Sequence, residues 1–347
     1  MKTNVLAFCF KTIPSAVIGV IKPLEKMEQK QILNFKYKET RNITEQDIEL
    51  ADVIICIRGA EEIEVHIVDR CKDQGKYLIN YLDDDLLNIN TLSNSYNKSY
   101  FEKENVRNNL KLIMKKSNCL WTTNNKIAVN YSSFFDKVIV TNAPALLLNA
   151  KNTEISQINN KNFITIGFAG GIDHRAFFEK ILMRPFRNIF VEYKDKIKIE
   201  IFGFMPYYMH NLPLSYYEYK EDYNQYKSFM LSRKWDIALA PLENTSFHSC
   251  KYFNKFLEYG SIKAAGIYSN VEPYTLIVQN NNNGLLVDNN TKDWLNAIIS
   301  LINNEQKRMD IINNAYLLLK DKFNVDKIAS DIINAIPELY QYKAISQ

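Results

Sequence analysis

Two consecutive glycines follow an apolar run in the second half of the chain. The run FITIGFA ends at Ala169, and Gly170 and Gly171 come directly after it, ahead of a pattern typical of a helix. Glycine lets a backbone approach a ligand closely, and a helix N-terminus presents unpaired N–H groups and a positive dipole end. This arrangement suits a diphosphate. An ordinary strand-to-helix turn has the same pattern, and the dinucleotide fingerprint G-x-G-x-x-G is absent.

Two lysines and a glutamate recur at helical spacing further along. Lys251, Lys255 and Glu258 are four and three residues apart, so on a helix beginning near residue 249 they share a stripe about 60° wide. Ammonium groups can neutralise phosphates, and a carboxylate can accept both hydroxyls of a ribose. The stripe therefore indicates a nucleotide-binding face. A solvated helix face with a weak Lys255–Glu258 ion pair fits the spacing equally well.

Three consecutive aspartates, Asp83, Asp84 and Asp85, follow the apolar run that ends near residue 81. Carboxylates clustered at the end of a strand can hold Mg²⁺ or Mn²⁺ against a diphosphate. An acidic loop that caps a helix is the other interpretation of these residues.

The four histidines are not spaced as metal ligands. His174 lies at the start of the helix predicted after the glycine pair, where it can meet a phosphate, and His66 stands among glutamates on a predicted surface helix. The sequence contains neither H-x-x-x-H nor a nucleophile elbow, so metallohydrolase and serine hydrolase functions have no support. We expect no metal and no cofactor.

These residues must be positioned by alternating strands and helices. Short apolar runs alternate with helical patterns, which indicates βαβ units and parallel sheets. The expected strands are residues 4–10, 52–57, 77–81, 119–123, 137–141, 163–169, 198–202, 236–240, 266–269 and 284–287. The expected helices are 23–30, 60–74, 101–117, 126–134, one directly after the glycine pair, 223–232, one from about 249, two within 292–322, and 325–337.

The chain of 347 residues fits two domains of ~150 to 200 residues each. An Asn-rich stretch without periodicity, residues 149–162, is the predicted linker. We expect a first domain over 1–150, a second over 156–325, and a last helix within 326–347 that returns to the first domain. Two successive parallel-sheet domains place the ligand site in the cleft between them.

Composition narrows the classes of partner. The net charge of +4 is small, and nucleic-acid binders usually concentrate basic residues on one face, so we expect no nucleic acid. The five cysteines form no C-x-x-C pair, which indicates free thiols and a cytoplasmic protein. There is no convincing signal peptide and no apolar run near ~18 residues. Peripheral contact with the inner face of the membrane stays open.

The segment DIALAPLENTSFHSCKYFNKFLEYGSIKAAGIYSNVEPY, with the later NNGLLVDNNTKDW, resembles the donor-binding half of the GT-B glycosyltransferases of family 4. ITIGFAGGIDH is similar to the entry strand and phosphate loop of one subgroup of that family. The resemblance covers about residues 160–325. It extends weakly into the first half, through DVIICIRG and the acidic YLDDDLL.

The resemblance implies roles for the nucleotide-binding residues. Glu258 matches the second glutamate of the family's E-x7-E motif and would hold the donor ribose. Lys251, as the catalytic cation, and Lys255 would neutralise the diphosphate together with the Gly170-Gly171 loop, and His174 matches a histidine of that loop.

The resemblance also implies where the sugar and the acceptor bind. Cys250 stands where the family has the first glutamate of E-x7-E, which usually contacts the donor sugar. Glu243 or His248, in the preceding loop, could take over that contact. Asp83, Asp84 and Asp85 would lie on the acceptor side.

We therefore expect an α/β protein of the GT-B type, with two Rossmann-like parallel-sheet domains facing each other across a cleft. It would transfer a sugar from a nucleoside diphosphate sugar to a hydroxyl of a glycan, protein or lipid-linked acceptor, retaining configuration and without a metal. Three alternatives stay open: a GT-B-fold sugar-nucleotide epimerase, a non-catalytic sugar-nucleotide or glycan-binding subunit, and a metal-dependent GT-A transferase that uses Asp83–Asp85.

Overall fold

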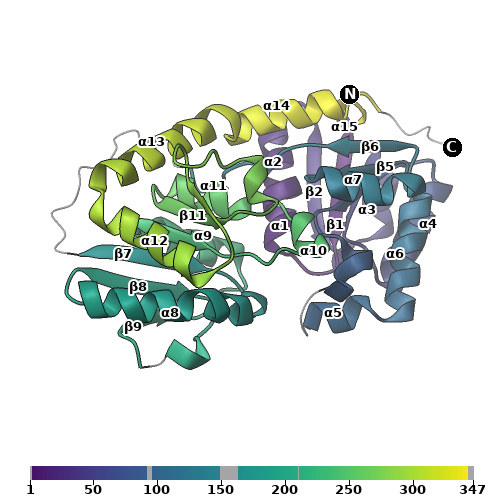
Figure 1. Cartoon of the computed structure of the whole chain (residues 1–347). Helices are drawn as coiled ribbons and strands as arrows, with labels where there is room; N and C mark the ends of the chain where they lie inside the picture. Colours follow the sequence, from purple (N-terminus) through teal and green to yellow (C-terminus); the bar gives the residue numbers. More distant parts are fainter. Residues whose placement is uncertain (1, 92–95, 149–162, 210, 343–347) are drawn as a thin grey trace. The chain divides into compact units, whose positions relative to one another are not determined.

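The computed structural model describes residues 2–91, 96–148, 163–209 and 211–342. The chain forms two compact units (Figure 1). Unit 1 comprises Met1–Pro144, Cys250–Tyr252 and Phe323–Gln347, and unit 2 comprises Ala145–Ser249 and Phe253–Lys322. Two segments distant in sequence thus complete unit 1. The predicted linker, residues 149–162, lies outside the described residues.

Unit 1 is built on a six-stranded parallel sheet of order β2-β1-β3-β4-β5-β6. Strand β3 is buried along its whole length and reads as an unbroken apolar run, as expected of a parallel strand covered on both faces. Because the strands are parallel, their carboxyl ends lie at the same end of the sheet. The loops after β3, β4 and β5 begin there, at Arg58, Asp83 and Thr123. The strands are β1 (Asn4–Cys9), β2 (Asn34–Glu39), β3 (Val53–Ile57), β4 (Tyr77–Leu82), β5 (Cys119–Thr122) and β6 (Lys137–Val140).

Helices pack on the unit 1 sheet and bury two apolar clusters. One cluster joins β1, β3 and β4 to α4 and α6, and the other joins the ends of β4 and β5 to α6 and α7. The C-terminal helices belong to this unit, because Asp326 pairs with Lys30 at 2.6 Å and Glu338 with Lys137 at 2.7 Å. The helices are α1 (Pro14–Ala16), a π-helical segment (Val17–Ile21), α2 (Lys22–Gln29), α3 (Glu45–Leu50), α4 (Glu62–Asp73), α5 (Tyr96–Phe101), α6 (Glu104–Lys116), α7 (Asn125–Tyr131), α14 (Val325–Ala335) and α15 (Glu338–Gln341).

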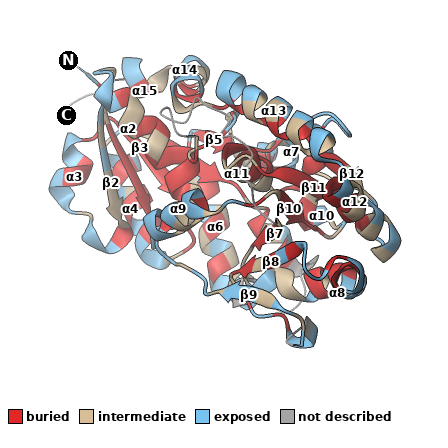
Figure 2. Cartoon of the chain, turned by 90° about the vertical axis from the view of Figure 1, so that its left-hand side faces the viewer, coloured by how far each residue is buried: buried red, intermediate tan, exposed pale blue. Residues whose placement is uncertain are grey.

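Unit 2 repeats the architecture with a second six-stranded parallel sheet, of order β12-β11-β10-β7-β8-β9. Its central strands are buried (Figure 2), and their apolar side chains pack against α8 and α12 around Trp294 and Phe186. The strands are β7 (Ile164–Ala169), β8 (Ile197–Phe202), β9 (Leu214–Tyr217), β10 (Ile237–Ala240), β11 (Ala265–Ser269) and β12 (Leu285–Val287). The helices are α8 (Arg175–Tyr193), α9 (Tyr223–Ser232), α10 (Ser246–Ser249), α11 (Asn254–Ser261), α12 (Thr291–Asn303) and α13 (Glu305–Lys322).

The ten strands predicted from apolar runs are all present, and the structure adds β2 and β9. Both added strands lie at a sheet edge and are only partly buried, and neither NFKYKE nor LSYY is a continuous apolar run. The structure also adds α3. The first helical region begins at Pro14 rather than near residue 23, and a separate α5 precedes α6.

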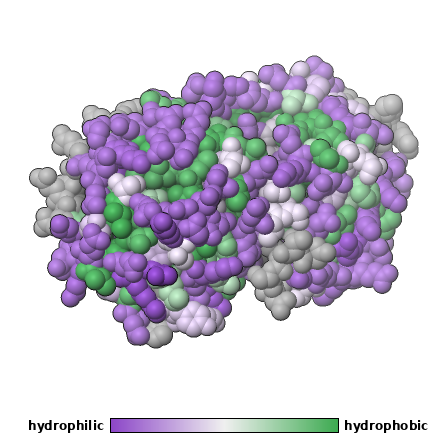
Figure 3. Space-filling view, viewed as in Figure 1, coloured by the Kyte–Doolittle hydropathy of each residue, from purple (hydrophilic) through white to green (hydrophobic). Residues whose placement is uncertain are grey.

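Within the described parts of the chain, no helix combines the length and the apolar composition needed to cross a bilayer. The face shown in Figure 3 is largely hydrophilic, with smaller groups of hydrophobic residues between the polar ones.

Candidate functional site

Strand β7 ends at the predicted glycine pair, and its neighbour β8 ends at another glycine. Gly170 N donates a hydrogen bond of 3.1 Å to the carbonyl oxygen of Phe202. Gly203 has φ of +107°, and a Cβ atom there would overlap the carbonyl oxygen of Gly170. Only glycine permits this close approach of the two strand ends. Sequence reasoning did not select Gly203 as a site residue, although its position directly after a predicted strand was a signal.

The three predicted phosphate-binding residues after β7 lie together. Gly170 and Gly171 lead into a 3₁₀ turn, Ile172–His174, and α8 follows from Arg175. The amide of His174 donates to Gly171 O at 3.1 Å, and a Cβ atom on Gly170 would lie 3.3 Å from the His174 ring. A Cβ atom on Gly171 would meet no described heavy atom within 4 Å. The backbone at Gly171 is therefore accessible beside the start of a long helix.

Glu258 on α11 is held by two other side chains. Lys255 Nζ lies 2.7 Å from Glu258 Oε2, and the hydroxyl of Tyr226 on α9 donates to the same oxygen at 2.8 Å. The carboxylate is 13% exposed and the ammonium 23%, so the group is neither buried in the core nor freely solvated. Burial and the charge of Glu258 raise the pKa of Tyr226 well above its ordinary value. The phenol thus stays protonated and acts as a donor.

Tyr259, the residue after Glu258 on α11, fastens the helix to the sheet. The hydroxyl of the fully buried Tyr259 donates to Leu239 O at 2.9 Å and accepts from the amide of Ala169 at 3.4 Å. Its ring packs edge-on against Trp235. One side chain therefore links α11 to the ends of β10 and β7, so Glu258 and the glycine pair share one rigid framework in unit 2. Sequence reasoning missed Tyr259, for which only its place beside Glu258 was a signal.

Lys251 does not lie on α11, which corrects the predicted helical stripe. The helix that was expected from residue 249 is interrupted between α10 and α11, and the intervening residues 250–252 belong to unit 1. Asn124 Nδ2 donates to Lys251 O at 2.9 Å, and the amide of Ala143 donates to the hydroxyl of Tyr252 at 3.0 Å. The segment is therefore bonded to unit 1, and these long-range contacts replace the helical turn that its spacing predicted.

Asp83 and Asp84 bind cationic side chains of their own unit. The Arg58 guanidinium is bidentate to Asp83, with Nη2 2.7 Å from Oδ2, and also reaches Asp84 Oδ2 at 2.7 Å. Lys251 Nζ lies 3.2 Å from Asp84 Oδ1. Burial by itself raises the pKa of Asp84, but the charges of Lys251 and Arg58 outweigh it and hold that pKa below its ordinary value. Arg58, the arginine of the motif DVIICIRG, is another site residue that sequence reasoning did not select.

Asp85 belongs to a separate, buried network. Its side chain accepts hydrogen bonds from Tyr131 Oη at 2.6 Å, Asn130 Nδ2 at 2.9 Å and Asn88 Nδ2 at 3.0 Å. The Cys250 thiol, 2% exposed, points to the same carboxylate with Sγ 3.6 Å from Oδ2. The Asp85 carboxylate is thus hydrogen-bonded to other side chains of the protein. Position 250, where the resembled family has a glutamate, is a buried thiol of unit 1.

The two residues predicted to contact a donor sugar follow β10. Glu243 is half-buried. His248 is buried, with Nδ1 2.8 Å from Thr245 Oγ1, and its own amide donates to the same hydroxyl at 3.1 Å. The imidazole is therefore tied to its own turn. Ser269 Oγ accepts a 2.8 Å hydrogen bond from the amide of Leu242, which fixes the start of this loop.

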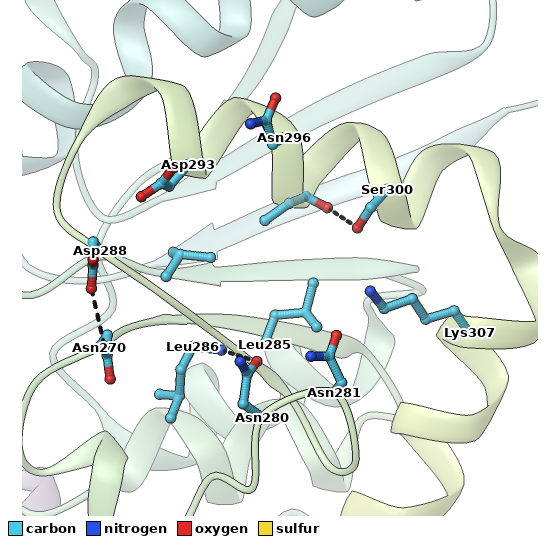
Figure 4. A pocket seen from close by; sticks show the side chains of 12 residues that line it. Asn270, Asn280, Asn281, Leu285, Leu286, Asp288, Asp293, Asn296, Ser300 and Lys307 are labelled. Atoms are coloured by element: carbon cyan, nitrogen blue, oxygen red, sulfur yellow. Dashed lines mark hydrogen bonds between the residues drawn. The ribbon is translucent and has the colours of Figure 1, made fainter.

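A polar cavity of about 420 Å³ opens beside the edge strand β12 (Figure 4). Asn296 and Ser300 of α12 line it together with Asn281, and Lys307 of α13 lies at one end. Asn280 Oδ1 accepts a hydrogen bond of 3.0 Å from Leu286 N, which occupies a backbone donor of this edge strand. None of the residues predicted from the sequence to bind donor or acceptor lines this cavity.

Neither a family model nor a curated protein matches the sequence, but solved structures match the fold. The chain is similar to Anabaena HepE in complex with UDP-glucose, at 11% identity and a TM-score of 0.66, over 98% of this chain and 100% of HepE. It is similar to sucrose-phosphate synthase from Thermosynechococcus elongatus, at 11% identity and a TM-score of 0.64, over 97% and 99% of the two chains. It is also similar to a protein assigned as a UDP-N-acetylglucosamine 2-epimerase from Listeria monocytogenes, at 12% identity and a TM-score of 0.60, over 97% and 96%.

The fold is of the GT-B type. Two parallel-sheet units and the match over nearly the whole length of these structures confirm the predicted α/β fold class. The GT-A alternative is therefore wrong, because it required a single-domain fold. Among the residues with described positions, no group of three or more His, Cys, Asp or Glu side chains is placed to hold a metal ion.

Proposed function

We propose that this protein is a glycosyltransferase that moves a sugar from a nucleoside diphosphate sugar to a hydroxyl of a glycan, protein or lipid-linked acceptor. The observation that carries the proposal is the Glu258 carboxylate, oriented by Tyr226 and Lys255 on a helix that Tyr259 ties to the end of β7. The solved structures with this fold include HepE in complex with UDP-glucose, which supports a sugar-nucleotide donor. We propose that the reaction retains anomeric configuration and uses no metal.

The donor would bind to unit 2. Glu258 would accept the ribose hydroxyls, and Lys255 would supply positive charge for the diphosphate. The open space at Gly171 would let the phosphates approach the backbone of the Gly170-Gly171 loop, and the start of α8 adds N–H groups and a positive dipole end. His174, whose ring lies against Gly170, is the third proposed phosphate contact. Glu243 and His248 are the residues that we propose to contact the donor sugar.

The chemistry follows from the charge that develops on the leaving group. The bond between the anomeric carbon and the diphosphate oxygen breaks, the acceptor oxygen bonds to that carbon, and its proton is released as the nucleoside diphosphate departs. Cations and oriented N–H groups stabilise the growing negative charge on the diphosphate. Lys251 is the proposed catalytic cation, and its ammonium would exchange its contact with Asp84 for one with phosphate.

We place acceptor recognition in unit 1. Arg58, Asp83 and Asp84 lie at the carboxyl edge of its sheet, where loops of parallel sheets usually bind ligands. Paired carboxylates and a guanidinium can bind the hydroxyls of a sugar or the charge of a lipid-linked phosphate. Because Asp85 is bonded to Tyr131, Asn88 and Asn130, we assign it to the support of this edge.

A sugar-nucleotide epimerase is the second candidate, because the protein assigned to that activity in Listeria monocytogenes has a similar fold. An epimerase would convert the donor without an acceptor, whereas a transferase needs one to form a glycoside. Analysis of products with and without candidate acceptors separates the two. The third candidate is a non-catalytic binding subunit, which would bind a donor and form no product. It is supported by the buried Cys250, which stands where the resembled family has a glutamate.

A thermal-shift panel of UDP-, GDP-, ADP- and CMP-sugars, with and without EDTA, tests the donor proposal. A ligand that binds the folded state raises the melting temperature by mass action, so one nucleotide class should stabilise the protein without added metal. The same panel on Glu258→Ala identifies the site. If no sugar nucleotide stabilises the wild-type protein, the proposal fails, and a shift abolished by EDTA contradicts metal independence.

We also propose that the protein works in the cytoplasm, where lipid-linked acceptors would be reached at the inner face of the membrane. All five cysteines are buried and none of them forms a disulfide, which supports a reducing compartment.

A further inference from the structure

Both donors to Glu258 use the same carboxylate oxygen. Tyr226 Oη lies 2.8 Å and Lys255 Nζ 2.7 Å from Oε2. Lys255 Nζ is also 3.4 Å from Tyr226 Oη, so the three groups form a closed triangle. Within the described part of the chain, Oε1 receives no hydrogen bond. One oxygen of the carboxylate is thus committed to the protein, and the other is left to accept from a ligand.

Aromatic packing holds the Tyr226 ring in place on α9. Its ring centroid lies 5.3 Å from that of Phe202, and the Phe229 ring lies 4.6 Å from the same phenylalanine. Asp222 caps α9, accepting from Gln225 N at 2.9 Å. A lysine reaches its partner through a flexible stem, and a partly exposed pair three residues apart on one helix fixes a geometry weakly. The phenol is therefore the group that can hold the carboxylate in one orientation.

We propose that Tyr226 positions Glu258 for ribose recognition, so that Oε1 accepts the ribose hydroxyls while the phenol holds Oε2. This inference rests on the proposed function, because it presumes that Glu258 binds a nucleotide ribose. Tyr226 does not itself contact the ligand in this arrangement. Its effect on nucleotide affinity passes through the orientation of one carboxylate.

The test measures the affinity of UDP and GDP and of their 2′-deoxy counterparts by calorimetry, for wild type, Tyr226→Phe, Glu258→Ala and Tyr217→Phe. The nucleotide that binds the wild type is used for comparison. Tyr217→Phe is the matched control, because Tyr217 packs against Phe229 in the same aromatic group but contacts Glu200 instead of Glu258. Thermal melts verify that each variant folds.

We expect Tyr226→Phe to raise the Kd of the ribonucleotide about 10-fold, equivalent to ~1.4 kcal/mol. Its ratio of 2′-deoxyribonucleotide to ribonucleotide Kd should fall toward 1, as in Glu258→Ala, while Tyr217→Phe keeps the wild-type ratio. A purely structural role would weaken both nucleotides equally and leave the ratio unchanged, which would overturn the inference. If the wild type binds neither nucleotide, or Glu258→Ala leaves the ratio unchanged, the proposed ribose site itself is wrong.

Discussion

Lys251 and Asp84 form an ion pair with a 3.2 Å separation, although they are 167 positions apart in the sequence. The same carboxylate is bonded to Arg58, so Asp84 is shared by two cations. The Lys251 ammonium is thus held beside the loop that follows β4, where we propose that it exchanges its carboxylate contact for one with phosphate.

Lys251→Ala should lower turnover more than it weakens donor binding, because the proposed contact strengthens as charge develops on the leaving diphosphate. We expect kcat to fall by about 100-fold or more, with a change in donor Kd of less than about threefold. Donor hydrolysis or transfer gives kcat, and calorimetry gives Kd. The exposed Lys292 of α12, changed to alanine, is the control. Wild-type turnover in Lys251→Ala would remove this lysine from the mechanism.

Glu258→Ala should weaken nucleotide binding, because it removes the proposed acceptor of the ribose hydroxyls and leaves Tyr226 and Lys255 without their shared partner. Hydrogen bonds to a charged group are worth ~1.5 to 3 kcal/mol, so the Kd of the donor should rise by about 10- to 150-fold. Glu305→Ala, at an exposed position on α13, should bind normally. Equal affinity of Glu258→Ala and wild type would refute the assignment.

Two glycine substitutions should separate folding from binding. Gly203→Ala places a Cβ atom on the Gly170 carbonyl oxygen at a φ of +107°, so it should destabilise unit 2 by more than ~1 kcal/mol. Gly171 has a φ of −75°, and a Cβ there meets no described atom within 4 Å. Gly171→Ala should therefore fold like wild type yet bind the donor diphosphate more weakly. Urea denaturation and calorimetry measure the two effects, and unchanged binding by Gly171→Ala would argue against phosphate contact with this loop.

Asp47 should contribute an acid-sensitive part of the stability of unit 1. Burial raises the pKa of Asp47, but hydrogen bonds from Lys36 and Lys38, each 2.6 Å away, outweigh it and place the folded-state pKa below its ordinary value. Since an unfolded aspartate titrates near ~3.9, the contribution is present above about pH 4 and is lost as the pH falls toward the lower folded-state pKa.

The stability difference between wild type and Asp47→Asn should therefore be largest near neutral pH and shrink below about pH 4. Urea denaturation at pH 7, 4 and 3 measures the free energy of unfolding of both proteins. Asp136→Asn, at an exposed position, should differ little from wild type at each pH. A difference that is the same at every pH would show that the charge of Asp47 is not responsible.

Much of the fold could be predicted from local pattern. Parallel strands covered on both faces must be apolar throughout, so runs such as DVIICI and FITIGFA identify β3 and β7 without tertiary information. The edge strands β2 and β9 could not be found in this way. Both strands are partly exposed, and NFKYKE and LSYY lack the continuous apolar run that marks a buried strand.

The candidate site was only partly predictable. The glycine pair and Glu258 follow from chemistry and spacing within a few residues, and the structure places them on one framework in unit 2. Periodicity assigned Lys251 to the same helix as Glu258. Residue spacing reflects only the local helical turn, so it could not reveal the hydrogen bond from Asn124 or the ion pair with Asp84. Tyr226 had no local signal, since it lies on a different helix from the carboxylate that it holds.

The amino-acid pattern therefore determined the type of most segments, because burial of a strand or helix face depends on side chains only a few positions apart. Which side chains meet was settled by folding. Arg58 with Asp83, Lys251 with Asp84 and Tyr226 with Glu258 are partners 25, 167 and 32 residues apart. Such pairs form only when sheet order and helix packing bring separate segments together, so the charges and orientations of the site are properties of the tertiary structure.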